Sequence, residues 1–507
     1  MSFIRNFPLF TIVLSLFSGA LCLLISSKAA RIYTVLLESV LTVMVSMTLW
    51  YTYTTDSAFT YKMGEFPAPW GNEIRAGVLE CVIALTFLII ILMSLLAGDH
   101  FLRIDIDESK QNLFFSLVSL MTAALMAMTW TNDIFTGYVF LEILTLTSCG
   151  VLIVREIGRT TLAAVRYMIL NLLGSGLFLL GVVLLYDLSG HLLMVPMHEA
   201  IARIAEDPES IPVIALSVGI LTIGLGIKSG LFPFYYWMPD TYGSATPASA
   251  SLMSSLVTKA YIFLLIKIYF RAVGMEVIRK TSILEILFVL GILGMIFGSV
   301  RAVSTGSINR MIAYSSAAQI GYIYMGLGIG TLAGLTGALF QIVAHGFTKS
   351  LLFLTVPYLA EASGNSLLFG SLRGAARKDR QAAFFFLIGA LSMVGIPFFA
   401  GFPVKLLLGE SAVGQHSSFK LLAAMLGLAI STLLNAMYFI RTLILLNMEK
   451  LPEEASPGEM KVRSKSGGVQ RIGYPFAALV LAAANIFLGV FSWTLVELIR
   501  LGLAMFQ

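Results

Sequence analysis

Five lysines lie inside or near the ends of long apolar stretches of the sequence, where solvating partners are scarce. They are Lys228, Lys259, Lys267, Lys349 and Lys405. Insertion of a lysine at the centre of a membrane helix costs about 2.5–3.5 kcal/mol of free energy. Several such lysines would burden a passive structural protein, so they indicate a polar, hydrated interior.

A carboxylate and a lysine in two of these stretches could form a proton-carrying pair. Glu142 lies in the first half of the stretch 134–154, and Lys228 lies near the middle of the stretch 212–236. Pro233 follows Lys228 and should kink or break the helix, because proline removes a backbone hydrogen bond. Freed carbonyls at membrane depth need protein or water as partners. We therefore expect Lys228 to line a wet cavity, where approach of Glu142 favours the ammonium form and its withdrawal favours proton release.

Further titratable groups could pass the proton onward through the interior. Lys259 lies about three turns inside an apolar stretch, and Lys405 follows a stretch that prolines interrupt. His345 and Lys349 are four residues apart, so they share one helix face. Because histidine titrates near neutrality, it can relay a proton. We expect the order Lys228, Lys259, His345 and finally Lys405.

Each of these residues also has a purely structural interpretation. Glu142 alone could make a hydrogen bond between helices, and His345 alone could be a packing histidine. Lys259 taken alone is open to either interpretation. Lys267 and Lys349 are expected to be interfacial or structural, and Lys267 could extend its ammonium group to the membrane interface. The functional interpretation rests on the combination of these groups with two broken helices.

The composition places the chain in a membrane. Of 507 residues, 58% are hydrophobic and 12% are charged, whereas a soluble domain carries about a quarter charged residues. The apolar content also excludes a disordered chain. A formal net charge of +5 over 507 residues does not indicate nucleic-acid binding. The cysteines Cys22, Cys81 and Cys149 are far apart and lack the spacing of metal ligands, so they are expected to be packing residues.

The sequence predicts an all-α polytopic membrane protein with about fourteen transmembrane helices, because a spanning helix needs about 20 mostly apolar residues. The predicted spans are residues 8–26, 32–52, 76–98, 111–130, 134–154, 164–186, 212–236, 247–270, 283–300, 309–328, 332–357, 382–407, 419–442 and 474–503. The polar stretch 447–472 is rich in Pro, Gly and Ser. It is expected to be a surface loop or an interfacial segment.

The positive charges predict an orientation. Most lysines and arginines of the connections follow odd-numbered spans, and cytoplasmic loops collect positive residues. Both termini are therefore expected to face outward. The N-terminal segment lacks a convincing small-residue cleavage site, so it is expected to be a retained first helix rather than a signal peptide.

Two lysine-bearing spans, 212–236 and 382–407, are interrupted by proline and lie five spans apart. Because five is odd, the two spans should cross the membrane in opposite directions. Inverted repeats with discontinuous helices near the membrane midplane have this pattern.

Several motifs resemble one family of membrane subunits. The first motif runs from Lys228 to Lys259 and places a lysine, a Pro/Trp/Pro-Asp segment that includes Asp240, a Pro-Ala-Ser turn and a second lysine in this order. Three more motifs follow, which read NRMIAYSSAAQIGYI, HGFTKSLLF from His345 and GIPFFAGFPVKLLL. Together they resemble the antiporter-like subunits of respiratory complex I, Mrp-type cation/proton antiporters and membrane-bound hydrogenases.

The resemblance implies a fold of fourteen helices with two inverted repeats of five helices that contain broken helices 7 and 12. It fits the D-type Mrp subunit, its hydrogenase counterpart and the N-type complex I subunit. The implied organisation is N-terminal helices 1–3 in residues 1–110, a first repeat in residues 111–271, a second repeat in residues 283–442, and a polar loop with a last helix in residues 443–507.

The resemblance also implies a Glu142–Lys228 pair and a hydrophilic axis through Lys259 and His345 to Lys405. Secondary candidates are Lys349, Asp240 and Glu80. Relatives usually carry an aspartate in the third helix, and here Glu80 is expected to substitute for it. This departure concerns the first three helices and leaves the central motifs intact.

The leading hypothesis is a proton-translocating antiporter-like subunit of a multi-subunit complex in a prokaryotic inner or plasma membrane. Its expected partners are other membrane subunits, including a further antiporter-like subunit or a redox module, and its ions are H⁺ and in some contexts Na⁺. We expect no cofactor, metal site or catalytic redox centre in this chain. Two alternatives stay open: a stand-alone secondary transporter of a small solute, and a non-conducting structural membrane subunit.

Overall fold

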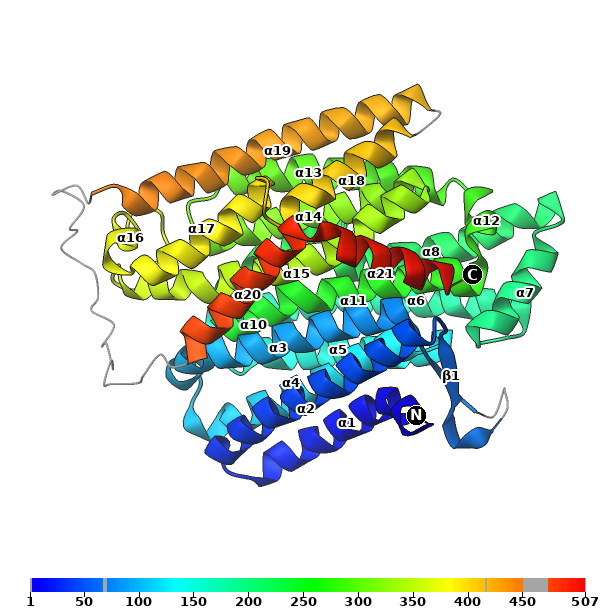
Figure 1. Cartoon of the computed structure of the whole chain (residues 1–507), viewed down its shortest axis with the longest axis horizontal. Coiled ribbons are helices and arrows are strands. Elements are labelled where there is room, and N and C mark those ends of the chain that lie inside the picture. The colour runs from blue at the N-terminus through cyan, green and yellow to red at the C-terminus, as the bar shows by residue number, and fades with distance from the viewer. Residues whose placement is uncertain (1, 67–70, 415–416, 450–472, 507) are drawn as a thin grey trace.

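The computed structural model describes residues 2–66, 71–414, 417–449 and 473–506. Long helices run side by side across the molecule, and both chain ends lie at the same end of the bundle (Figure 1). Within the described ranges, twelve helices are long and apolar enough to span a membrane. This confirms the predicted all-α membrane fold, whereas the count of fourteen spans and the repeats stay predictions.

The N-terminal part contains four long helices and a small hairpin. The helices are α1 (Phe7–Leu24), α2 (Ser27–Thr54), α3 (Val78–Asp105) and α4 (Glu108–Trp130). The hairpin pairs β1 (Phe59–Lys62) with β2 (Glu73–Ala76) in antiparallel register, with Phe59 opposite Ala76. The sequence analysis did not predict this hairpin, because the two strands are short and lie in a polar connection.

The middle of the chain alternates long helices with short irregular ones. Its α-helices are α5 (Ile134–Ile153), α6 (Gly158–Ser189), α7 (Met194–Ile204), α8 (Ile211–Ser229), α9 (Met238–Ser244), α10 (Pro247–Leu252), α11 (Thr258–Lys267) and α12 (Met275–Arg279). π-helical segments, Met253–Val257 and Ile268–Val273, flank α11. The predicted eighth span is thus one continuous helical rod with two local changes of hydrogen-bond pattern.

The C-terminal part contains the remaining helices. They are α13 (Ile283–Ser304), α14 (Ile308–Ile329), α15 (Leu332–Glu361), α16 (Ala375–Lys378), α17 (Arg380–Val394), α18 (Gly401–Val413), α19 (Ser418–Asn447), α20 (Gly473–Val490) and α21 (Ser492–Ala504). Each of the predicted spans overlaps one or more of the helices α1–α21 of the whole chain. The predicted surface loop 447–472 lies almost wholly outside the described residues.

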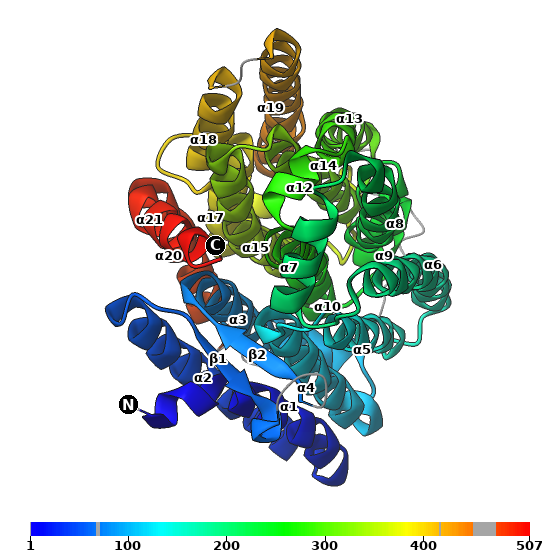
Figure 2. The ribbon, with the colours of Figure 1, turned by 90° about the vertical axis from the view of Figure 1, so that its right-hand side faces the viewer.

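Burial separates central helices from peripheral ones. The apolar windows of α15 and of the segment Pro247–Val273 are buried along their whole length, whereas those of α2 and α19 are only one-third buried. Viewed along the bundle, α15 lies between the N-terminal helices at one edge and α19 at the other (Figure 2). Lys259 and His345 of the predicted axis therefore lie on the most enclosed helices, whereas Lys228 lies on a segment whose apolar window is only half buried.

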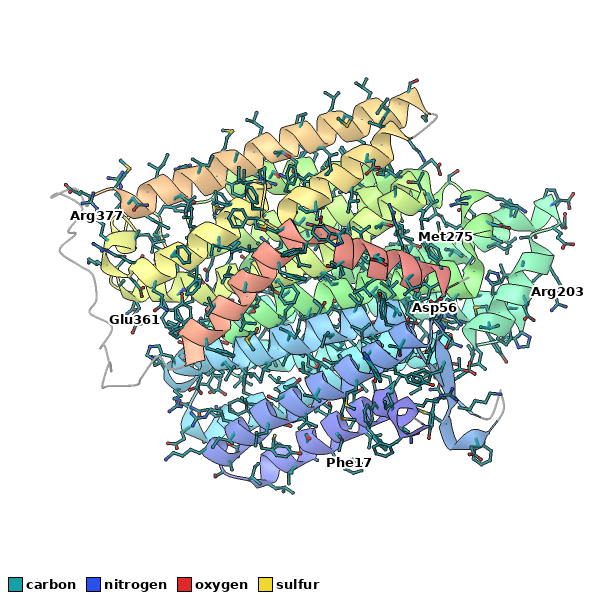
Figure 3. The ribbon with its side chains drawn as sticks, in the orientation of Figure 1. Phe17, Asp56, Arg203, Met275, Glu361 and Arg377 are labelled. Carbon is teal, nitrogen blue, oxygen red and sulfur yellow. The ribbon has the colours of Figure 1, made fainter. Side chains whose placement is uncertain are left out.

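The charged side chains gather at the two ends of the bundle. Figure 3 shows Arg377 and Glu361 at one end, Arg203 and Asp56 at the other, and Phe17 on the lateral surface. Phe17 is 73% exposed. An apolar belt between two charged ends is the surface that a bilayer requires.

Two helices break as predicted, but at glycine rather than at proline. α8 ends at Ser229, and Gly230 takes a φ of 73° while its N–H bonds to the last carbonyls of α8. α17 ends at Val394, and Gly395 takes a φ of 85° with the same kind of cap. Glycine suits both positions because it has no Cβ to clash in the left-handed region.

Candidate functional site in the membrane interior

The predicted Glu142–Lys228 pair is present, but it is loose. Lys228 Nζ lies 3.7 Å from Glu142 Oε1; the lysine side chain is fully buried and the glutamate side chain is 23% exposed. Glu142 Oε1 has no hydrogen-bond partner in the described part of the chain. Lys228 instead donates to Thr145 Oγ1 at 2.7 Å. The lysine therefore touches a neutral hydroxyl more closely than its counter-charge.

Local structure explains this placement. Glu142 and Thr145 are three residues apart on α5, so they point to the same side of that helix. Lys228 lies in the last turn of α8, where the negative end of the helix dipole favours a cation. Gly174 of α6 makes room, because a Cβ there would lie 3.0 Å from Lys228 Cγ.

Lys259 lies just after the first π-helical segment. Its side chain is fully buried, and its ammonium group donates to the carbonyl of Ser254 and to Thr258 Oγ1 at 3.2 Å. A π-helical turn disrupts the regular backbone ladder, which leaves a carbonyl available to the lysine. Ser254 also shares a hydrogen bond of 3.0 Å with Ser316 of α14.

His345 and Lys349 share one face of α15 as predicted. Both are buried, and Lys349 donates to the carbonyl of Ile312 and to Ser315. Lys259 lies within electrostatic range of both groups. Neither ring nitrogen of His345 has a hydrogen-bond partner among the described residues. The imidazole therefore has both ring nitrogens free to hydrogen-bond to water.

A small cavity connects His345 to the last predicted group. About 290 Å³ of space, partly open to the surroundings, lies between its lining atoms, and it has room for at most one water molecule. Its polar lining residues are Gln319, Gln341, His345, Thr348, Ser392 and Lys405. Gln341 donates to Gln319 across the cavity wall. The cavity thus gives a polar route from α15 to the second helix break.

Lys405 lies in the first turn of α18. Its ammonium group donates to the carbonyl of Val394, at the end of α17. Gly395 allows this approach, because a Cβ there would lie 2.9 Å from Lys405 Nζ. The lysine therefore covers the negative end of a helix instead of pairing with a carboxylate.

The structure places two of the three secondary candidates, Glu80 and Asp240, elsewhere. Glu80 is fully buried and forms an ion pair with Arg75, whose guanidinium also bonds to the carbonyl of Met505. Asp240 bridges Arg310 at 2.6 Å and Arg166 at 3.1 Å, on the exposed rim of the bundle. Neither carboxylate contacts the row of Glu142, Lys228, Lys259, His345 and Lys405 in the described structure.

Lys267 does not extend to the surface of the bundle, and Lys349 fits the structural rather than the interfacial interpretation. Both side chains are fully buried. Lys267 donates to the carbonyls of Thr129 and Thr131 at 2.8 and 2.6 Å, at the C-terminal end of α4. A buried helix end needs partners for its last carbonyls, and Lys267 supplies them from inside the protein.

Several polar residues that contact the row were not predicted from the sequence. Thr145 and Tyr261 surround Lys228, and Gln319 and Gln341 line the cavity near Lys405. The spacing of Glu142 and Thr145 on one helix face was a usable signal, as were two glutamines inside apolar spans. In the part of the chain that the structure describes, no group of three or more His, Cys, Asp or Glu side chains could hold a metal ion.

The chain resembles known proteins over most of its length. The family described as NADH:quinone oxidoreductase/Mrp antiporter, TM, matches residues 131–431. The N subunit of NADH-quinone oxidoreductase from Desulforudis audaxviator is 32% identical over 442 residues, which cover 85% of this chain and 84% of that protein. The chain belongs to this family. The matched range of this antiporter-like subunit contains all five residues of the predicted row.

Three further relatives support the fold of the antiporter-like subunit. The D-type subunit of the Na⁺/H⁺ antiporter from Bacillus subtilis is 25% identical over 414 residues, or 81% of each chain. A chain of the Mrp complex from Dietzia sp. superposes with a TM-score of 0.86 at 21% identity, over 99% of this chain and 97% of that one. A chain of the archaeal membrane-bound sulfane sulfur reductase superposes with a TM-score of 0.83.

Proposed function

We propose that this antiporter-like subunit carries protons through a multi-subunit membrane complex. The proposed path runs from the Glu142–Lys228 pair through Lys259 and His345 to Lys405. One observation carries the proposal. In the described residues, Lys259, Lys349 and Lys405 are held by backbone carbonyls and hydroxyls, with no carboxylate within ion-pair distance.

Neutral partners matter because they leave the protonation state of a lysine free to change. A lysine in a membrane pairs with a carboxylate or with backbone carbonyls, since an unpartnered charge is expensive there, and only the carboxylate adds a charge that favours the ammonium form. A carbonyl oxygen accepts from an ammonium group, and water can satisfy it when the lysine becomes a neutral amine. Lysines held in this way can therefore take part in a proton relay.

The proposed cycle begins at the partly exposed carboxylate. When a neighbouring subunit neutralises or withdraws Glu142, the ammonium form of Lys228 loses its counter-charge and releases a proton. The proton passes to Lys259 and His345, then through the water-sized cavity to Lys405. Approach of Glu142 restores the charge of Lys228 and prepares the next proton.

The partners and the membrane are also proposals. Glu142 is 23% exposed on a lateral face, so we propose that another membrane subunit covers it, either a second antiporter-like subunit or a redox module. The bias of lysines and arginines supports the proposal that both termini lie outside a prokaryotic cytoplasmic membrane. Their common position at one end of the bundle (Figure 1) supports an even number of spans.

Proton flux through the purified complex tests the proposal. The complex is reconstituted into vesicles that contain a pH-sensitive dye, with Glu142→Ala, Lys228→Ala or Lys405→Ala in this subunit. Each variant should lower flux at least about tenfold, while the subunit composition stays normal. Lys378→Ala is the matched control, because Lys378 is an exposed lysine in α16. Normal flux in all three variants, with assembly intact, would reject the relay.

A further inference from the structure

The hydroxyl of Thr145 has every hydrogen-bonding position filled. A threonine hydroxyl can donate one hydrogen bond and accept two. Thr145 Oγ1 donates to the carbonyl of Leu141 at 2.9 Å. It then has two acceptor positions left, and Lys228 Nζ at 2.7 Å and Tyr261 Oη at 3.1 Å fill them. The hydroxyl is thus a specific partner for Lys228 and not an incidental neighbour.

Thr145 and Glu142 offer Lys228 two alternative positions along α5. The lysine now lies at the hydroxyl, and a shift of about 1 Å would bring its nitrogen from 3.7 Å to hydrogen-bonding distance of Glu142 Oε1. Oε1 is buried and unpartnered in the described residues, so it is free to accept. The lysine needs only side-chain rotation to move between them.

Tyr261 connects this position to the next lysine. It lies on α11, two residues after Lys259, and its ring is 5.4 Å from Lys228 Nζ. Its hydroxyl joins α11 to α5 through the hydrogen bond with Thr145. A displacement of Lys228 toward Glu142 would therefore change the contacts of the helix that carries Lys259.

We propose that Thr145 is a positioning residue that holds Lys228 away from Glu142, and that Tyr261 transmits the position of Lys228 to α11. This inference rests on the proposed function. With Lys228 at Thr145, the ammonium group is 3.7 Å from its counter-charge instead of hydrogen-bonded to it, so it releases its proton more readily. One N–H bond of Lys228 breaks, and the proton passes through water to a neutral Lys259 Nζ. Thr145 keeps its own proton throughout.

Substitution of Thr145 tests the inference. Thr145→Val keeps the shape and removes the acceptor, so Lys228 should settle against Glu142. We expect proton flux of the reconstituted complex to fall about tenfold, because a hydrogen bond to a charged group is lost. Thr145→Ser restores the oxygen and should restore at least half of the flux. Tyr261→Phe should lower flux about threefold, because it removes only the second donor to Thr145.

The pH dependence of flux separates a positioning role from a structural one. The titratable groups that face this site are Glu142 and Tyr138 from α5, Tyr167 from α6 and Tyr261 from α11. In Thr145→Val the closer carboxylate favours the ammonium form of Lys228. The pH of half-maximal flux should therefore rise in that variant and return to the wild-type value in Thr145→Ser.

Thr147→Val is the matched control. Thr147 lies two residues further along the same helix and is also buried, but its hydroxyl bonds only to the carbonyls of Ile143 and Leu144 in its own helix. It should leave flux and pH profile unchanged. If Lys228→Ala abolishes flux and Thr145→Val does not change it, this inference fails and the relay stands. If Lys228→Ala leaves flux intact, the relay itself fails.

Discussion

The break between α8 and α9 and the break between α17 and α18 begin alike but place their lysines differently. Each begins with a glycine in the left-handed region, Gly230 at φ 73° and Gly395 at φ 85°. Lys228 lies before its break, in the last turn of α8, whereas Lys405 lies after its break, in the first turn of α18. The same type of glycine-capped break therefore has its ammonium group before the break in one case and after it in the other.

The partners differ as well. Lys228 has Glu142 at 3.7 Å and Thr145 at 2.7 Å, both from α5. Lys405 has the carbonyl of Val394 and a cavity wall that contains Gln319. An amide carries no charge, so nothing near Lys405 favours its ammonium form as strongly as Glu142 favours that of Lys228.

From this difference we infer that the two breaks have different roles in the proposed relay. The first break responds to charge, because a carboxylate lies beside it at the edge of the subunit. The second break responds to water, because its lysine lines a cavity and bonds to a helix end. Variants at and beside the two breaks should test this division, with effects that range from large to small.

Replacing either lysine by arginine should have the largest effect. Lys228→Arg and Lys405→Arg keep a positive charge, but a guanidinium group does not release its proton in proteins. We expect proton flux of the reconstituted complex to fall about 100-fold in both variants. The exposed control Lys378→Arg should transport normally. Flux retained in Lys405→Arg would show that the second break needs only charge and not proton release.

Replacing Gln319 by glutamate should make the second break resemble the first. The new carboxylate would line the cavity with Lys405 and favour the ammonium form of the lysine. We expect flux to fall about tenfold near neutral pH and to recover partly at higher pH, where the lysine again loses its proton. Gln319→Met, which fills the same space without charge, is the control. An unchanged pH profile in Gln319→Glu would contradict the assigned role of the cavity.

Placing alanine at the two glycines should separate stability from transport. Each Gly→Ala change forces a Cβ into the left-handed region and should cost about 1–3 kcal/mol of folding free energy. At Gly230 the added Cβ would meet the flexible end of Met238, whereas at Gly395 it would meet Lys405 itself. Thermal unfolding in detergent should therefore report both changes, while proton flux per folded complex should fall only for Gly395→Ala.

Gly409→Ala provides the matched control for these glycines. Gly409 lies within α18, and a Cβ there would meet nothing within 4 Å. Alanine at a helical position should leave stability unchanged or raise it by up to about 1 kcal/mol. If Gly409→Ala destabilised the protein as much as Gly395→Ala, the left-handed φ would not be the cause.

The sequence predicted the spans and the breaks well because both depend on local patterns. Apolar runs of sufficient length mark the helices, and Pro233 and Pro397 marked the two interruptions. The exact break points were missed, since the chain leaves the helix at Gly230 and Gly395, before each proline. A proline prevents a regular helix from continuing, but the residue that caps the end of each helix is a glycine.

Contacts across the bundle could not be predicted in the same way. The partner of Lys405 is a backbone carbonyl that only the break exposes, and the partners of Lys267 are carbonyls at the end of α4. Backbone acceptors have no signature in the sequence. Thr145 was overlooked because a threonine in an apolar span usually bonds to its own helix, as Thr147 does.

The smallest expected effect concerns the starts of the helices beside the two breaks. Asp133 caps the start of α5, where its carboxylate accepts from the N–H of Thr136 at 2.6 Å, whereas Ser307, which precedes α14, makes no side-chain cap bond. Both residues also form an isolated bridge to a neighbouring segment. Asp133→Ala should cost about 1 kcal/mol of folding free energy, and Ser307→Ala should cost much less. Equal shifts in unfolding temperature would show that the bridges and not the cap hold these helix starts.

The same aspartate gives a pH test with a defined sign. Burial raises the pKa of Asp133 above its ordinary 3.8, although hydrogen bonds from Thr136 and Phe135 oppose this. The folded state thus keeps the proton longer than the unfolded state, so wild-type stability should fall as the pH rises above 3.8. Asp133→Asn keeps a capping oxygen and does not titrate. The stability of this variant relative to wild type, from thermal unfolding at about pH 4 and about pH 7, should therefore increase with pH. A decrease would mean that the Thr136 N–H stabilises the carboxylate more than burial disfavours it.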